Sequence, residues 1–168
     1  MAAADIIKNY SLFVDGRGYA GQVTEFNAPE LAIQTEDFRA GGMDAPVALD
    51  MGMEGLETSF TLSKYDADVL SLFGIANGAA VQATVRAAAE SYDGTVRPVV
   101  YNMRGRITRI ARGAFTAGAM VPITITMRLD YYRETVNDVV IHEIDVVNMI
   151  RTIAGVDRLA EQRAALGL

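Results

Sequence analysis

A chain of 168 residues, 51% apolar and 21% charged, has the length and composition of one globular domain over residues 1–168. Cysteine is absent, which excludes disulfides, thiolate metal sites and cysteine nucleophiles, and the net charge of −6 is opposite in sign to that of most free-standing nucleic-acid binders. The start of the chain has no signal-peptide pattern and no run of about 18 apolar residues occurs, so we expect neither a leader nor a membrane-spanning helix.

The first third of the chain reads as a series of hairpins. Residues 11–14 are followed by Asp-Gly-Arg-Gly at 15–18, where glycine supplies the positive φ that a tight turn requires. We therefore expect a strand that ends before this turn and a returning strand over residues 19–27. A further extended segment is expected over residues 31–35, shortly after Pro29.

Residues 56–63 alternate clearly between apolar and polar side chains, which predicts a half-buried strand. The side chains expected on its inner face are Leu56, Thr58, Phe60 and Leu62. A short helix is expected over residues 66–73, because Asp66 is a good capping residue and Gly74 is a good stop. Its buried side would carry Val69, Leu70 and Phe73.

A long hairpin is predicted in the middle of the chain. Alternation over residues 81–90 favours a strand, although the many alanines leave a helix open on propensity. The sequence Tyr-Asp-Gly-Thr at 92–95 is typical of a hairpin turn, and residues 96–106 would form the returning strand. The side chains expected to face inward on the first strand are Val81, Ala83, Val85, Ala87 and Ala89. No role is assigned to the alanine-rich segment 74–89 beyond this strand.

The clearest strand of the chain is predicted over residues 121–131, with Pro122 near its start, where a missing donor is tolerated. Its inward set would be Val121, Ile123, Ile125, Met127, Leu129 and Tyr131. A last strand is expected over residues 139–147, and a helix over about 156–166 that ends before Gly167. The apolar stripe of that helix is narrow and suits docking, with Leu159, Arg163 and Leu166 on one side.

No arrangement of side chains in the sequence predicts catalysis, a metal site or a cofactor. His142 is the only histidine, so a paired-imidazole metal site is not available and a structural or surface role is expected. Glu143 and Asp145 share a strand face, whereas acid–base pairs normally come from different elements across a cleft. No serine lies in a Gly-x-Ser-x-Gly motif, and the glycines lack phosphate-binding spacing. We therefore expect no cofactor and no enzymatic activity.

One basic cluster stands out in this acidic chain, formed by Arg104, Arg106, Arg109 and Arg112. Nucleic-acid contact would favour aromatic residues interleaved with the arginines, but only Tyr101 and Phe115 bracket the run. The interpretation that we favour is contact with an acidic patch on a neighbouring subunit, and nucleic-acid contact is the alternative.

Short segments spread over most of the chain carry a family resemblance. The C-terminal part reads Glu-Ile-Asp-Val-Val-Asn-Met-Ile over residues 143–150 and Gly-Val-Asp-Arg-Leu over 155–159. Earlier, residues 38–43 read Phe-Arg-Ala-Gly-Gly-Met, 103–106 read Met-Arg-Gly-Arg and 131–133 read Tyr-Tyr-Arg. In this joint order, the segments resemble the major tail tube protein of contractile-tailed phages and the homologous tube subunit of R-type tailocins.

The resemblance implies a structural protein of the virion tail that assembles as hexameric rings, stacked into the inner tube of a contractile tail. The implied fold is mainly β with flanking helices, an antiparallel sandwich or partial barrel whose long hairpins build a continuous β-barrel in the oligomer. The implied partners are other copies of the chain, the sheath protein, the baseplate hub and the tail terminator. DNA would pass through the lumen without specific binding, or the tube would serve membrane puncture in a tailocin, with no membrane anchor on the subunit.

Two sets of surface residues are candidates for assembly. The loop over residues 39–52 is rich in glycine and methionine, which suits adaptable contacts with an adjacent subunit or the next ring. The interface candidates are Arg39, Gly41, Gly42, Met43, Met51, Arg104, Arg106 and Arg109. Polar strand faces are candidates to line the bore, where small polar and acidic side chains would let DNA slide. The lumen candidates are Thr84, Glu90, Thr124, Thr126, Arg128 and Asp130.

Two other classes of function compete with the tube subunit. Alternating strands also build small-ligand-binding β-barrels, which enclose a cavity. Such a binder would be monomeric and would melt at a higher temperature with its ligand, whereas a tube subunit would form rings without any ligand. The third class is a hydrolase whose site is created only by the fold.

Overall fold

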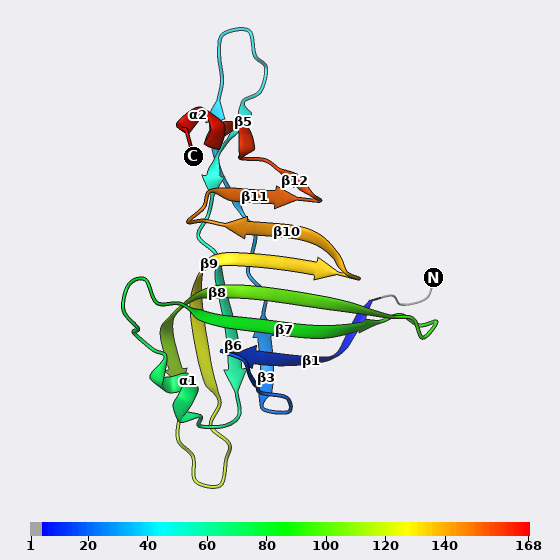
Figure 1. Cartoon of the computed structure of the whole chain (residues 1–168), viewed down its shortest axis with the longest axis vertical. Coiled ribbons are helices and arrows are strands. Elements are labelled where there is room, and N and C mark those ends of the chain that lie inside the picture. The colour runs from blue at the N-terminus through cyan, green and yellow to red at the C-terminus, as the bar shows by residue number, and fades with distance from the viewer. Residues whose placement is uncertain (1–4) are drawn as a thin grey trace.

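The computed structural model describes residues 5–168 and is mainly β, with an antiparallel sheet and two short helices (Figure 1). Neither helix among these residues is long and apolar enough to cross a membrane. The elements, in chain order, are β1 (Ile6–Val14), β2 (Arg17–Gly18), β3 (Val23–Asn27), β4 (Ile33–Phe38), β5 (Val47–Met53), β6 (Glu57–Leu62), α1 (Ala67–Ser71), β7 (Val81–Glu90), β8 (Val96–Arg112), β9 (Ile123–Val136), β10 (Val139–Asp145), β11 (Ile150–Ile153), β12 (Val156–Asp157) and α2 (Ala160–Leu166).

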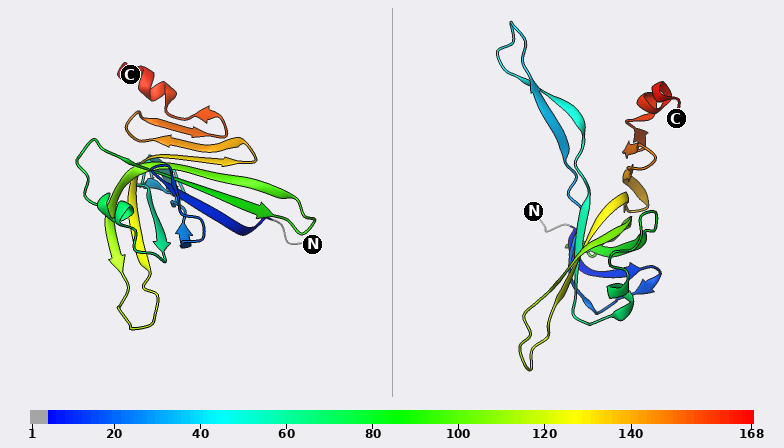
Figure 2. Two further views of the ribbon diagram at one scale, coloured as in Figure 1. Left: turned by 60° about the horizontal axis from the view of Figure 1, so that its bottom comes forward. Right: turned by 90° about the vertical axis from the view of Figure 1, so that its left-hand side faces the viewer.

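Ten of the strands form one sheet, in which all neighbours are antiparallel. The main order is β12-β11-β10-β9-β8-β7-β1-β2, and β6 also pairs with β9 while β3 pairs with β6. The remaining two strands, β4 and β5, form a separate two-stranded sheet that extends away from the rest of the molecule (Figures 1 and 2).

The two longest strands change direction part of the way along, and this divides the large sheet into two layers. Figure 1 shows β8 and β9 running across the view and then turning downward. The turn lies at register shifts next to Gly105 and Arg109 of β8. Gly105 is required there, because a Cβ atom would collide with the carbonyl of Arg128 and lie 2.8 Å from the Cα atom of Leu129.

We call the two parts layer A and layer B. Layer A contains β1, β7 and β10, with β8 up to Arg104 and β9 from Tyr131, and it is extended at its two edges by β2 and by β11–β12. Layer B contains β3 and β6, with β8 from Gly105 and β9 up to Leu129.

The hydrophobic core lies between the two layers. Leu12 of layer A and Phe60 and Ile125 of layer B belong to one cluster of buried side chains. The rings of Phe26 on β3 and Tyr101 on β8 lie 5.7 Å apart between their centroids, so the aromatic contact also joins the layers. The sheet therefore buries one face of each layer and leaves the other face of each layer exposed to solvent or to partners.

The alternating patterns correctly predicted the inner faces of three strands. Residues of β6, β7 and the first half of β9 point inward as expected, including Phe60, Val81, Ala89, Ile123 and Met127. The helical alternative for residues 81–90 is wrong, because these residues form β7 between β1 and β8. The turn after β7 is also confirmed, since the Ser91 N–H donates to Thr95 O and the Gly94 N–H donates to Ser91 O.

Tyr131 was expected to face the core, and this prediction is wrong. The register shift between layers A and B places an extra residue, Asp130, in β9 opposite the step from Arg104 to Gly105. The shift reverses the alternation, so Tyr132 is the buried side chain, with 2% of its surface exposed.

Several other strands begin or end at residues that differ from the predicted ones, because of how the strands pair. The returning strand expected over 19–27 is shorter, because residues 19–22 are not strand and β3 begins at Val23, where it pairs with β6. The two residues of β2 that pair with β1 lie within the turn expected over 15–18. Strand β8 continues past residue 106 to Arg112, since its second half pairs with β9 in layer B. The strand over 139–147 ends at Asp145, and residues 150–153 turn back to form β11.

The two helices are real but shorter than expected. Asp66 caps α1 as predicted, because its carboxylate accepts from the N–H groups of Asp68 and Val69. The start of the C-terminal helix at 156 was wrong, since Val156–Asp157 is strand β12 and the helix begins at Ala160. It ends as predicted at Gly167, whose φ of +74° closes the helix in the left-handed region.

Candidate subunit interface

The β4–β5 hairpin is the largest exposed feature of the described chain. Every residue of β4 is exposed, and the hairpin extends beyond the two layers in Figure 1 and in the right view of Figure 2. Its tip is held by local contacts: Arg39 Nε donates to Met43 O over 3.2 Å, and the Met43 N–H donates to Ala40 O over 3.2 Å. Gly42 has a φ of +90°, which glycine adopts easily. The candidates Arg39, Gly41, Gly42 and Met43 therefore all lie at this tip.

One face of the hairpin is apolar and uncovered. Directly paired residues share a face, and Phe38 pairs with Val47 while Glu36 pairs with Leu49. Phe38 is 52% exposed and Leu49 is 46% exposed, although both are large hydrophobic residues. Met51 continues the same strip towards the base of the hairpin, and we call Phe38, Val47, Leu49 and Met51 the apolar strip. Because an isolated two-stranded hairpin is only marginally stable in water, this strip is suited to contact with another chain.

The base of the hairpin is joined to layer A by a charged pair. Arg151 on β11 donates through Nη2 to Asp50 Oδ2 over 2.8 Å, and the Gly52 N–H donates to Asp50 Oδ1 over 2.8 Å. These hydrogen bonds, first from Arg151 and then from Gly52, lower the pKa of the Asp50 carboxyl below its ordinary value of 3.8. No local sequence pattern indicates this pair, because its two residues are 101 positions apart.

A cavity of about 620 Å³ lies between the hairpin base and the C-terminal region. Its lining is largely apolar and rich in methionine, including Met51, Met53, Met149 and Leu159. Asp50 and Arg151 lie at its edge, so the ion pair and the cavity form one junction between hairpin and body.

The predicted arginine cluster is divided by the turn of β8. Arg106 donates to the side chain of Asn77, and Arg109 and Arg112 are exposed on the end of β8 that leads to the β8–β9 loop. In this loop Phe115 is 76% exposed, and its ring stacks on that of Tyr65 with centroids 6.4 Å apart. Basic and aromatic side chains thus share the end of the molecule opposite the β4–β5 hairpin (Figure 1).

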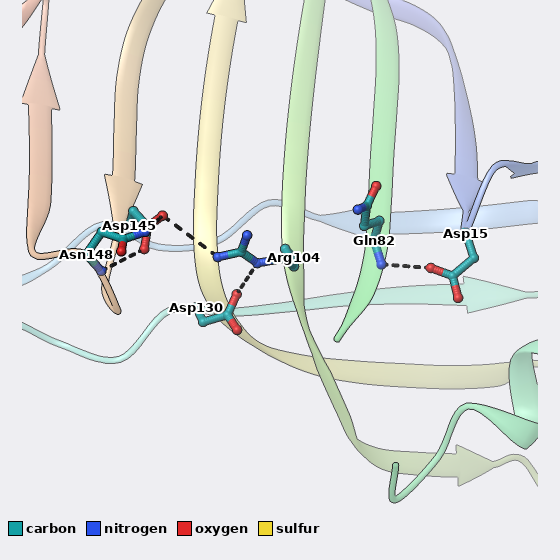
Figure 3. A network of polar contacts seen from close by, with 6 residues as sticks. All are labelled: Asp15, Gln82, Arg104, Asp130, Asp145 and Asn148. Atoms are coloured by element: carbon teal, nitrogen blue, oxygen red, sulfur yellow. Dashed lines mark hydrogen bonds and ion pairs between the residues drawn. The ribbon is translucent and has the colours of Figure 1, made fainter. Parts of the chain in front are cut away.

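Arg104 lies apart from the other arginines, on the outer face of layer A. Its Nε donates to Asp130 Oδ1 over 3.0 Å, and its Nη2 lies 3.8 Å from Asp145 Oδ2 (Figure 3). Asp145, which is buried, also accepts from Asn148 over 2.8 Å. The guanidinium further lies 5.4 Å from the ring centroid of Tyr131. This network joins β8, β9 and β10 at the point where the two layers separate.

The lumen candidates fall on two different outer faces. On layer A, Thr84 accepts from Asn102 Nδ2 over 3.2 Å, and Glu90 Oε1 accepts from Lys8 Nζ over 2.7 Å. On layer B, Thr124 and Thr126 lie on the outward side of β9, where the Thr124 hydroxyl is 3.0 Å from that of Thr61.

The remaining two candidates divide in the same way. Arg128 is exposed on layer B, 3.7 Å from Glu57, whereas Asp130 belongs to the network at the boundary with layer A. Because the core separates the layers, these two faces point away from each other.

His142 and its acidic neighbours take structural positions. The Nδ1 atom of His142 lies 2.7 Å from Glu134 Oε2, which also accepts from the Tyr132 hydroxyl over 3.2 Å. Burial raises the pKa of Tyr132 strongly, and the Glu134 charge adds to this effect. Glu143 accepts from the Tyr131 hydroxyl over 2.8 Å. Residues 5–168 contain no cluster of three or more side chains suited to hold a metal ion.

The sequence matches known proteins over nearly its whole length. A family model described as phage tail tube protein FII matches residues 4–167. The tail tube protein of Escherichia phage P2 is 30% identical over 174 residues, covering 100% of both chains. The major tail tube protein of Serratia phage KSP20 is 30% identical over 153 residues, covering 89% of this chain and 88% of the relative.

Solved structures show the same fold at low identity. A chain in the sheath-tube complex of the PVC extracellular contractile injection system, in its extended state, superposes with a TM-score of 0.60 at 11% identity, over 78% of this chain and 90% of that chain. A chain of the baseplate of the anti-feeding prophage gives a TM-score of 0.52 at 11% identity, over 74% and 89%.

The fold and the exposed apolar hairpin are those of a β-sheet protein with a surface suited to association with other chains. The chain belongs to the phage tail tube protein FII family and is a tail tube component of the virion. The family resemblance seen in the sequence is confirmed by these matches. Four residues of the candidate interface that the sequence did not name individually are Phe38, Val47 and Leu49 of the apolar strip and Arg151 at its base. Their signal was weak, because apolar residues on an exposed two-stranded sheet have no period that distinguishes them from core residues.

Proposed function

We propose that copies of this chain form hexameric rings that stack into the inner tube of a contractile tail and provide the conduit for DNA. The observation that carries this proposal is the apolar strip, which leaves large hydrophobic side chains uncovered on a hairpin that extends from a well-packed body. Exposed apolar surface of this kind marks association sites on proteins that are otherwise soluble. Membership in the tail tube family supports a tube as the form of the assembly.

The open edge of layer A supports a continuous barrel in the oligomer. Within the described chain, β1 pairs with β7 along one side, but on its other side only Phe13 and Val14 pair, with β2. Its first residues, from Ile6 onward, therefore present unpaired backbone groups at a sheet edge, and such edges readily pair with another chain. Joining this edge to the β11–β12 side of a neighbour would extend the sheet from one subunit to the next.

The outer face of layer A is the better candidate for the lumen. It belongs to the layer whose edges are open, and it carries Thr84 and Glu90, with Asp130 at its boundary. Two of its cations, Lys8 and Arg104, are paired with carboxylates of the same chain, whereas Arg86 is exposed there and has no ion-pair partner among residues 5–168. Because Thr124, Thr126 and Arg128 face away on layer B, one bore cannot be lined by both sets, and we assign these three to the outside of the tube. A cross-link between layer B residues and a probe confined to the lumen would contradict this assignment.

The partners follow from the complexes in which similar chains occur. One structural neighbour belongs to a sheath-tube complex and another to a baseplate. We extend both associations to this chain, with a sheath around the tube, a baseplate hub at one end and a tail terminator at the other. The interface candidates Met51, Arg106 and Arg109 lie on the two projecting ends, whereas Arg104 is engaged within its own chain.

Negative-stain electron microscopy of the purified protein over a range of concentrations tests the proposal. Six-fold rings or hollow tubes, formed without any ligand, are the expected result. If the sample remains monomeric, addition of a cognate baseplate hub should start polymerisation. A chain that stays monomeric with the hub, and melts at a higher temperature with a small molecule, would refute the proposal in favour of a ligand-binding barrel.

A further inference from the structure

The molecule has two projections, and they lie at opposite ends of its long axis. The β4–β5 hairpin forms one end, and the β8–β9 loop with the adjoining part of β8 forms the other (Figures 1 and 2). We call residues 33–53 the hairpin end and residues 105–122 the loop end. Most side chains of both ends are exposed, although Ile107 at the base of the loop end belongs to the core cluster.

The two ends carry opposite charge. The hairpin end contains four carboxylates and one arginine, a net charge of −3, and the loop end contains three arginines and no carboxylate, a net charge of +3. Glu36, Asp37 and Asp44 at the hairpin end are exposed and have no ion-pair partner among residues 5–168. Within the same described residues, Arg109 and Arg112 at the loop end are likewise exposed and without an ion-pair partner. Charges left unpaired in this way are available to a second chain.

Both ends also carry apolar surface next to the charges. The apolar strip of the hairpin includes Phe38 and Leu49, with Glu36 beside Leu49 on the same face and Asp37 on the opposite face. At the loop end, Phe115 and Met120 are largely exposed beside the arginines. An apolar centre with a charged surround is the usual arrangement of a protein–protein contact.

We propose that the hairpin end of one copy docks on the loop end of a second copy, with acidic and basic side chains paired across the contact. This inference rests on the proposed function, because it names the surfaces through which subunits of the tube meet. The contact is heterologous, since each copy contributes a different end, and heterologous contacts generate rings or open stacks rather than two-fold dimers. Charge complementarity would select this pairing over contacts between like ends, which repel.

Paired charge reversals test the proposal directly. In the hairpin variant, Glu36→Lys and Asp37→Lys change the net charge of that end from −3 to +1. In the loop variant, Arg109→Glu and Arg112→Glu change the other end from +3 to −1. All four side chains are exposed, so both variants should fold and melt like the parent chain.

Neither variant should form tubes alone, because its two ends then carry charge of the same sign. An equimolar mixture should assemble, since the basic hairpin of one variant meets the acidic loop end of the other. A chain with all four reversals should assemble by itself. The matched control, Glu36→Asp with Asp37→Glu, keeps the hairpin charge and should form tubes like the parent. Assembly of the parent chain should also weaken as salt is raised.

The outcomes separate this inference from the proposed function. A parent chain that forms neither rings nor tubes, even with a baseplate hub, overturns the proposed function. If the parent forms tubes and each single-end variant also does, only the inference is overturned. The inference is likewise overturned if folded variants fail alone and the mixture fails too. If the variants alone give single rings and the mixture gives tubes, the contact lies between rings, and if they give no rings, it lies within a ring.

Discussion

The body of the molecule and its β4–β5 hairpin are both built from antiparallel strands, but they differ in whether their apolar side chains are covered. In the body, the central strands of layers A and B cover their apolar faces with the other layer, and Phe60 is only 1% exposed. In the hairpin, a similar strand pair leaves Phe38 and its neighbours uncovered and depends on one ion pair at its base. The difference indicates that the body determines whether the chain folds, and the hairpin determines what the folded chain binds.

Removing the hairpin should have the largest effect on assembly and little effect on folding. Replacing residues 34–52 by a two-residue Asn-Gly turn leaves the core cluster intact, because none of these residues belongs to it. We expect complete loss of tubes in electron microscopy with the melting temperature of the body unchanged. Normal tubes from the shortened chain would contradict the division between body and hairpin.

Truncating one phenylalanine in the body and one in the hairpin should change the free energy of unfolding by very different amounts. Phe60→Ala empties a buried position, and deletions of this kind cost about 3–5 kcal/mol of unfolding free energy. The matched variant Phe38→Ala removes the same atoms from an exposed position, so its cost should stay within about 0.5 kcal/mol. Urea unfolding of the unassembled chains measures both values, and equal losses would show that the hairpin is part of the folding unit.

A smaller loss is expected where layers A and B separate. Gly105→Ala places a methyl group against the backbone of Arg128, which must move, and overpacking of this kind costs about 1–3 kcal/mol. Gly41→Ala on the hairpin is the control, since a Cβ atom there meets no atom within 4 Å and φ is not positive. Thermal unfolding should separate the two variants, and an unchanged Gly105→Ala would place the close approach in doubt.

The smallest expected change is in the pKa of Asp50, when its ion pair with Arg151 at the hairpin base is removed. A carboxyl whose pKa is lower in the folded chain stabilises it above the unfolded value, near 3.8 for Asp50, and loses this contribution as pH falls through the folded pKa. Arg151→Met should raise the Asp50 pKa towards 3.8, followed by NMR titration of the carboxyl carbon. The pKa of Asp157 should stay low in the same variant, because its main cause is the hydrogen bond from the Leu159 N–H. An unmoved Asp50 titration would assign its shift to Gly52 instead.

The strands that the sequence predicted correctly are those with one buried face. In β6, β7 and the first half of β9, local alternation and burial coincide, so a period of two identifies the inner residues. The prediction failed at Tyr131, because the bulge at Asp130 depends on how β8 and β9 pair, and no local pattern reports pairing. It also failed at residues 47–53, interpreted as part of a loop, because both faces of β5 are exposed and no alternation is required.

The candidate site was predicted in part for a similar reason. The composition of residues 39–43 indicated an exposed, adaptable tip, and the structure places them there. The alternation of side chains along a strand predicts whether a residue faces the core or the solvent. It does not predict to which of the two layers a solvent-facing residue belongs. Thr84 and Thr124 therefore looked equivalent in the sequence, although the core lies between their strands.

The paired charges on layer A bear on how a nucleic acid would pass over it. Binding of proteins to DNA is driven largely by the release of mobile ions that are condensed on the phosphates, and this release requires cations that are free to replace them. Arg104 already lies beside Asp130 and Asp145, and Lys8 lies on Glu90. These cations have fixed neighbours in place of mobile ones, so a phosphate backbone gains little entropy by approaching them. If this face lines the tube, we therefore expect weak adhesion of DNA around these two cations, because they are paired, and stronger adhesion at Arg86, which has no ion-pair partner among the described residues.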